Sequence, residues 1–148
     1  MLTKSPYVAD KNLDNLSSRW LIQFGKHHYV DVFVWESVDG LFLNTGFQKK
    51  LYAGAYIAFP GRGRSGLFGE IHLIRDMIGA GYVSHEIMHL IYDWMSDRDM
   101  KEFKSGLCLN ERAAYLMSNV TTDFWNEFYN FYDVVPSRHG ETIPEEAV

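Results

Sequence analysis

Residues Gly81 to Trp94, with the sequence GYVSHEIMHLIYDW, carry two histidines four positions apart on a segment with helical periodicity. Gly79 and Gly81 precede the segment as helix breakers, and the polar run 96–99 follows it. We therefore expect one helix with one buried face. The apolar residues at the three- and four-residue steps of that face are Val83, Ile87, Leu90, Ile91 and Trp94.

The spacing His85-Glu86-x-x-His89 predicts a metal centre. Positions four apart on an α-helix lie about 40° apart around its axis, so both imidazoles can bind one ion. Glu86 lies about 100° from His85, where its carboxylate can take a proton from metal-activated water. We predict one zinc ion per chain, with Glu86 as the catalytic base. Tyr92 and Met95 stand where the metzincin pattern needs Gly and His, so that class is excluded.

A hydrolytic zinc site needs three protein ligands and one open position. Asp93 or Asp97 could supply the third ligand, but Asp93 lies one turn further along the same helix and would have to curl back onto the ion. The segment 110–117, NERAAYLM, predicts a second helix whose two alanines permit close approach to the first. We select Glu111 as the third ligand.

Residues 85–89, then Asp93, then Asn110-Glu111 resemble the gluzincin arrangement of thermolysin-like peptidases, H-E-x-x-H-x-x-x-D followed by N-E. The resemblance covers about residues 52–119. In its small size the chain is similar to minimal metallopeptidase-like domains of bacteria, phages and mobile elements. It implies a zincin-like zinc metallopeptidase. Asp93 would then orient a zinc histidine, or else lie on a solvated face. Tyr115 departs from the pattern, which places an aspartate there to orient a histidine.

The zincin resemblance also implies how a substrate would bind. The strand that precedes the motif helix, here residues 69–75, would offer a free edge to an extended protein or peptide substrate. On that strand His72 shares a face with Glu70 and Ile74. His72 could touch substrate, but we favour a half-buried sheet residue, because strand residues usually serve packing.

The order of the expected elements favours an α+β domain, in which a small twisted mixed sheet packs on the motif helix and on the C-terminal helix that bears Glu111. We expect a single domain over 1–135 and a loosely ordered tail over 136–148. The expected elements are a first helix from Asp14 to Gly25 carrying Leu16, Trp20, Leu21 and Phe24, a strand over 29–35, a turn at Asp39-Gly40, strands over 54–59 and 69–75, and a helix over 109–131.

Composition restricts the class of protein. The net charge of −5 over 148 residues argues against nucleic-acid binding, and no apolar run is long enough to cross a bilayer. The N-terminus has no secretory signal, and the lone Cys108 fits a reducing compartment. We expect a cytoplasmic protein, or one in the host cytoplasm if it is of phage or mobile-element origin. The segment 61–66, GRGRSG, is expected to be a loop rather than a dinucleotide site, because a strand follows it.

Three hypotheses about function follow. The first is a zinc metallopeptidase that hydrolyses peptide bonds in a narrow set of proteins. The second is a zincin-fold binding or regulatory protein that keeps structural zinc but acts without proteolysis, because a fold and even a site do not fix a function. The third is a structural protein with a fortuitous motif. No residue is assigned to stabilise the oxyanion.

Overall fold

The computed structural model describes residues 11–24, 27–46, 54–59, 66–96 and 106–132, with side chains from Glu111 onward in the last range. It is an α+β arrangement, as the order of elements predicted. The elements are η1 (Leu13–Asn15), β1 (Leu16–Phe24), β2 (His28–Trp35), α1 (Val38–Thr45), β3 (Gly54–Ala58), β4 (Leu67–Ile74), η2 (Arg75–Met77), α3 (Ala80–Ser96) and α4 (Gly106–Tyr132). The predictions of a strand at 29–35, strands near 54–59 and 69–75, the motif helix and the C-terminal helix are confirmed.

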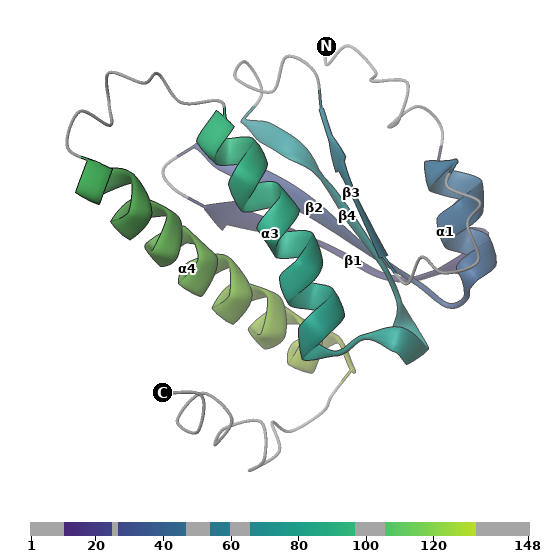
Figure 1. Ribbon diagram of the computed structural model, residues 1–148. Helices are drawn as coiled ribbons and strands as arrows, with labels where there is room; N and C mark the ends of the chain where they lie inside the picture. The colour runs from purple at the N-terminus through teal and green to yellow at the C-terminus, as the bar shows by residue number, and fades with distance from the viewer. Residues whose placement is uncertain (1–10, 25–26, 47–53, 60–65, 97–105, 133–148) are drawn as a thin grey trace.

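The four described strands form one mixed sheet in the order β1-β2-β4-β3 (Figure 1). β2 and β4 are parallel, and the other two pairs are antiparallel. β4 therefore lies inside the sheet, and the expectation that residues 69–75 form a free edge is wrong. A continuous buried run is typical of an internal strand, and all of β4 after Leu67 is buried. The edge strand beside the motif helix is β3.

The segment predicted as a first helix is the strand β1. The helical prediction rested on Leu16, Trp20, Leu21 and Phe24, but Leu21 is 59% exposed. From Ser18 onward buried and exposed residues alternate strictly along β1. A period of two is that of a strand with one buried face, and antiparallel pairing with β2 outweighs the weaker helical spacing.

The predicted turn at Asp39-Gly40 is also wrong, because both residues lie inside α1. Gly40 is needed for close packing: a Cβ at this position would lie 2.3 Å from Oδ1 of Asn15. α1 ends at Gly46, whose φ of 78° is the left-handed conformation that glycine adopts readily at a helix C-terminus. Gly40 therefore allows α1 to pack closely on Asn15 and does not form a hairpin turn.

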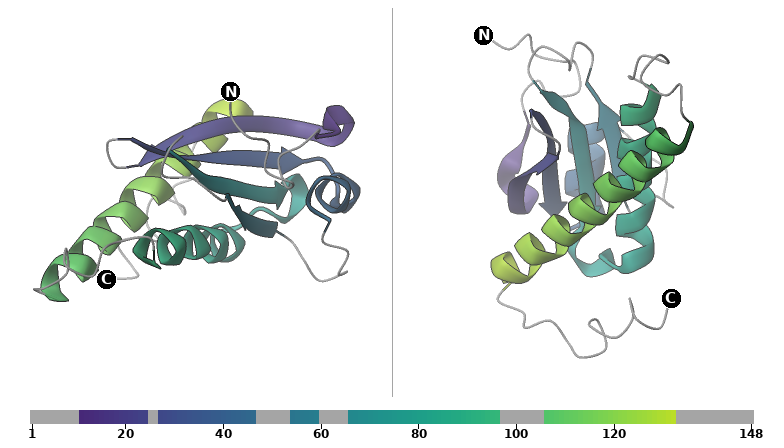
Figure 2. Two further views of the ribbon diagram at one scale, coloured as in Figure 1. Left: turned by 90° about the horizontal axis from the view of Figure 1, so that it is seen from above. Right: turned by 90° about the vertical axis from the view of Figure 1, so that its left-hand side faces the viewer.

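The two faces of the sheet carry different layers. α3 and α4 cover one face, while α1 packs near one end of the other (Figure 2). The larger core joins β-strand residues such as Val32, Ile71 and Leu73 to Ile87 of α3 and Val120 of α4. A smaller core on the opposite face includes Phe33, Trp35, Leu41 and Ile74. Among the described helices, none combines the length and the apolar character that a membrane crossing needs.

His72 lies on the face away from α3 and is fully buried. The indole N–H of Trp35 donates to its Nδ1 at 2.9 Å, and its Nε2 lies 2.9 Å from Oε1 of Glu70. An indole can only donate, so the ring proton must be on Nε2 and is donated to Glu70. Burial lowers the pKa of His72, and a second ring proton would displace the Trp35 bond. Lys11 makes an ion pair with the same carboxylate at 3.1 Å.

The neutral state of His72 predicts a loss of stability in mild acid. Unfolding releases a histidine with the ordinary pKa of 6.5, which is higher than in the folded chain. The unfolded chain then binds more protons below this pH, so the free energy of unfolding falls as pH falls, by up to about 1.4 kcal/mol per pH unit. Urea denaturation from pH 7.5 to pH 5 should show a steeper loss in wild type than in His72→Gln. The exposed control His27→Gln should match wild type, and an equally steep loss in His72→Gln would contradict a neutral, buried His72.

Candidate metal centre

The candidate centre lies on α3, whose apolar stripe determines which residues point outward. Val83, Ile87 and Leu90 are almost fully buried in the larger core. Since 3.6 residues complete a turn, residues between these positions point to the other side of the helix. His85 and His89 are accordingly exposed, while Glu86 is buried at the boundary.

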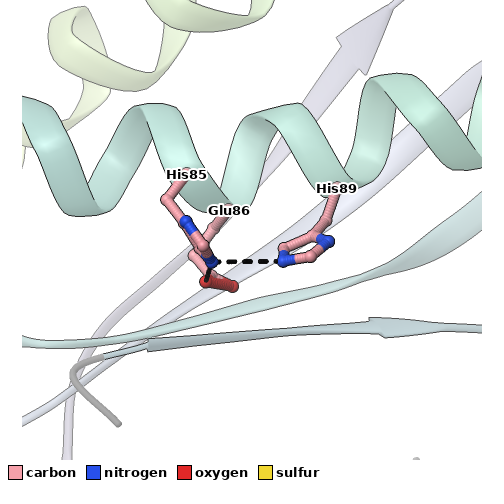
Figure 3. Close-up of side chains that lie close together, drawn as sticks. All are labelled: His85, Glu86 and His89. Atoms are coloured by element: carbon pink, nitrogen blue, oxygen red, sulfur yellow. Dashed lines mark hydrogen bonds and ion pairs between the residues drawn. The ribbon is translucent and has the colours of Figure 1, made fainter. Parts of the chain in front are cut away.

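The two imidazoles converge as the motif predicts (Figure 3). Their Nε2 atoms are 3.2 Å apart, and the rings are almost perpendicular, with centroids 4.8 Å apart. Two nitrogens bound to one tetrahedral zinc ion, each at about 2.0–2.1 Å, would be separated by about 3.3 Å. The observed spacing therefore fits two nitrogen ligands of one ion. Among the described residues, His85, Glu86 and His89 form a group whose ligand atoms all lie within 4.8 Å of one another.

Glu86 contributes a buried carboxylate to this group. Its Oε1 lies 3.7 Å from Nε2 of His85, and its Oε2 is buried without a hydrogen-bond partner. The side chain packs against the start of β3, where a Cβ on Gly54 would lie 3.3 Å from Cγ of Glu86. Burial raises the pKa of Glu86 to about 7. A carboxyl group with such a pKa can both accept and release a proton near neutral pH.

The environment of His89 favours the neutral form of its imidazole. Burial and, to a smaller extent, the charge of His85 lower the pKa of His89. A histidine must be neutral to offer its lone pair to a metal. When it is ionised, the neighbouring carboxylate of Glu86 adds the negative charge that a divalent ion favours.

The structure does not bring Glu111 into this group. Glu111 is exposed near the start of α4, in the turn that carries Arg112 over the ring of Trp94. Tyr115 lies one turn further along α4 and is 65% exposed. The assignment of Glu111 as a metal ligand therefore rests on sequence reasoning and on the gluzincin resemblance. Asp97 and the side chain of Cys108 lie outside the described residues.

Asp93 is half-buried and faces the sheet. Its Oδ2 accepts a 2.6 Å hydrogen bond from the hydroxyl of Tyr56 on β3. His72 lies on the other face of the sheet and is not part of the candidate centre. Sequence reasoning missed Tyr56 and Gly54. The sequence signal for them was their spacing of two residues, which places both on one face of a strand. This spacing does not indicate which helix that face contacts.

Comparison with known proteins returned no match: no protein-family model, curated protein or solved structure matches this chain.

The buried Glu86 predicts a pH-dependent stability of the metal-free protein. Its pKa is raised from 4.5 to about 7, so between these values the folded chain holds a proton that the unfolded chain releases. Stability from this residue is then lost as pH rises through this window. In EDTA, Glu86→Gln should gain about 1 to 2 kcal/mol relative to wild type between pH 5 and pH 8, allowing for solvent screening. Chemical denaturation of both proteins measures the difference.

The control for this experiment is Glu111→Gln, which removes an exposed carboxylate from α4. Its stability relative to wild type should not change over the same pH range. A Glu86→Gln variant whose relative stability is also independent of pH would contradict the burial of Glu86.

Proposed function

We propose that this chain is a zinc-dependent metallopeptidase. The observation that carries the proposal is the convergence of the His85 and His89 Nε2 atoms, 3.2 Å apart, beside the buried carboxylate of Glu86. A mixed sheet that packs on the motif helix and has an antiparallel edge strand is compatible with a zincin-like fold. Nucleophilic catalysis by a side chain is not needed, because the site holds a general base beside two metal-ligand nitrogens.

His85 and His89 would hold the ion, with Glu111 as the proposed third ligand. Zinc bound there would supply a Lewis acid that polarises a carbonyl and lowers the pKa of a water molecule. If both facing imidazole nitrogens carry lone pairs, the lone pairs repel each other unless a proton or a cation lies between them. A bound cation would accept both lone pairs. The donor set of nitrogen and carboxylate oxygen is one that zinc commonly takes.

Glu86 would act as the general base and then as the general acid. Its Oε1, which lies 3.7 Å from Nε2 of His85, would accept a proton from the attacking water, and the pKa of about 7 suits this step near neutral pH. The same carboxyl group can deliver that proton to the leaving nitrogen. Gly54 leaves room for this side chain, since a Cβ at that position would lie 3.3 Å from Cγ of Glu86.

The substrate would be an extended segment of protein that pairs with β3. β3 pairs with β4 on one side and ends the sheet of described strands. It also runs beside α3 and touches Glu86 at its first residue. Strand addition supplies main-chain hydrogen bonds, while pockets for alternate side chains give specificity. The edge proposed for substrate is therefore β3, in place of residues 69–75.

The absence of Glu111 from the converging group favours a second candidate function. A zincin-like protein with an incomplete catalytic set would retain zinc for stability and act by binding a partner. In that case Glu86→Gln leaves the biological effect unchanged, whereas His85→Ala abolishes it.

The metallopeptidase proposal predicts one zinc ion per chain and a catalytic role for Glu86. Glu86→Gln should retain zinc but lose about 10² to 10⁴-fold in turnover, because it removes general acid–base catalysis. Metal analysis of the purified chain and cleavage of a mixed-sequence fluorogenic peptide pool measure the two effects. Wild-type turnover by Glu86→Gln would rule out the mechanism.

Removal of either imidazole should abolish zinc binding. His85→Ala and His89→Ala each leave one of the two converging nitrogens. The matched control His27→Ala removes an exposed histidine from the turn before β2. We expect zinc only in the control and in wild type after dialysis against a weak chelator. Zinc retained by both α3 variants would place the metal elsewhere.

The role of Glu111 is tested by its own substitution. If it is the third ligand, Glu111→Ala weakens zinc binding by about 100-fold or more, since the loss of a direct ligand should exceed the effect of an outer-shell residue. Tyr115→Phe, one turn along α4, should leave the affinity within about threefold of wild type. Competition with a zinc-binding dye measures both affinities, and an unchanged affinity in Glu111→Ala would remove this residue from the ligand set.

A further inference from the structure

One hydrogen bond joins the edge strand β3 to the helix that carries the histidine pair. The hydroxyl of Tyr56 donates to Oδ2 of Asp93 at 2.6 Å. Both side chains are half-buried. Hydrogen bonds from a hydroxyl to an ionised carboxylate at about 2.5–2.7 Å are roughly twice as strong as neutral ones. This contact is therefore a strong polar link between β3 and α3.

The neighbouring strand leaves room for this hydroxyl. On β4, a Cβ at Gly69 would lie 2.8 Å from the Tyr56 hydroxyl and 2.2 Å from the carbonyl oxygen of Ile57. Any side chain at Gly69 would therefore displace both Tyr56 and the backbone of β3. The Tyr56 hydroxyl also lies 3.3 Å from the carbonyl oxygen of Phe68. Tyr56 is thus fixed from the sheet as well as from the helix.

A second close approach lies along the seam between β3 and α3. It joins Gly54 and Glu86, because a Cβ on Gly54 would lie 3.3 Å from Cγ of Glu86. Glu86 and Asp93 are seven residues apart, which is about two helical turns, so they lie on the same side of α3. Gly54 and Tyr56 are two residues apart and therefore share a face of β3. His89 lies between the two contacts along the helix.

We propose that Tyr56 and Asp93 are positioning residues, which clamp β3 against α3 so that the strand edge is held beside the histidine pair. The inference rests on the proposed function, in which β3 receives an extended peptide. Neither side chain is assigned a contact with substrate or metal. Loss of the clamp would weaken the attachment of β3 to α3 and allow the strand to move relative to Glu86.

Amide hydrogen exchange tests the clamp without any assay of activity. In Tyr56→Phe and Asp93→Ala, amides of residues 54–58 should exchange about tenfold faster than in wild type, while those of β2 change less than about threefold, because a local opening affects only the element released. Asp93→Asn keeps an acceptor for the Tyr56 hydroxyl and should restore most of the protection.

Tyr132→Phe is the matched control. Its hydroxyl makes 2.7 and 2.6 Å hydrogen bonds to Ser17 and Ser18, so the same substitution removes a comparable contact between α4 and β1. Exchange in β3 should stay within about threefold of wild type in this control. The clamp is refuted if β3 is no more affected than β2 in Tyr56→Phe, or if Tyr132→Phe loosens β3 equally.

Peptide hydrolysis tests what the clamp positions. For a six-residue fluorogenic peptide chosen from a mixed pool by wild type, Tyr56→Phe should raise KM about tenfold and change kcat less than about threefold, since ground-state binding is what weakens. A blocked dipeptide amide, too short to pair along β3, should be cleaved as by wild type. Equal losses on both substrates would refute the positioning role. A wild-type chain that binds no zinc and cleaves no peptide would refute the proposed function. The hydrogen-exchange experiment does not depend on activity, so it would still test the clamp.

Discussion

The burial of one face of α3 on the sheet is the constraint on which the candidate centre depends. Val83, Ile87 and Leu90 are almost fully buried, so the helix cannot rotate without exposing them. The two histidines between these positions therefore face outward. The same packing places Glu86 at the boundary of the core, where its carboxylate is desolvated. A desolvated carboxylate is costly to ionise unless a cation lies close to it. The arrangement is thus one that could hold a metal ion.

Much of the fold could be predicted from local patterns in the sequence. The apolar stripe of α3 and the β-branched run of β2 are strong local signals, and both segments form the expected elements. The wrong assignment of β1 arose because Leu16, Trp20 and Phe24 fit a helical and a strand period at once. Only pairing with β2, a contact distant in sequence, selects the strand. The internal position of β4 likewise follows from parallel pairing with β2, which no local pattern reveals.

The residues of the candidate centre also differ in whether local sequence or tertiary packing brings them together. His85, Glu86 and His89 lie within five residues on one helix, so their convergence follows from helical geometry alone. Tyr56 and Asp93 are 37 residues apart and meet only because β3 lies at the edge of the sheet beside α3. A ligand from another helix, such as Glu111, depends on tertiary packing in the same manner, and the structure has this side chain exposed.

X-ray absorption at the zinc edge tests the central claim most directly, because it counts the atoms around the metal in the purified protein. We expect one bound zinc with two imidazole nitrogens at about 2.0–2.1 Å and oxygen in the remaining positions. In His85→Ala the imidazole signal should disappear along with the metal. Zinc that is bound without imidazole, or a wild-type chain that takes up no zinc, would contradict the account.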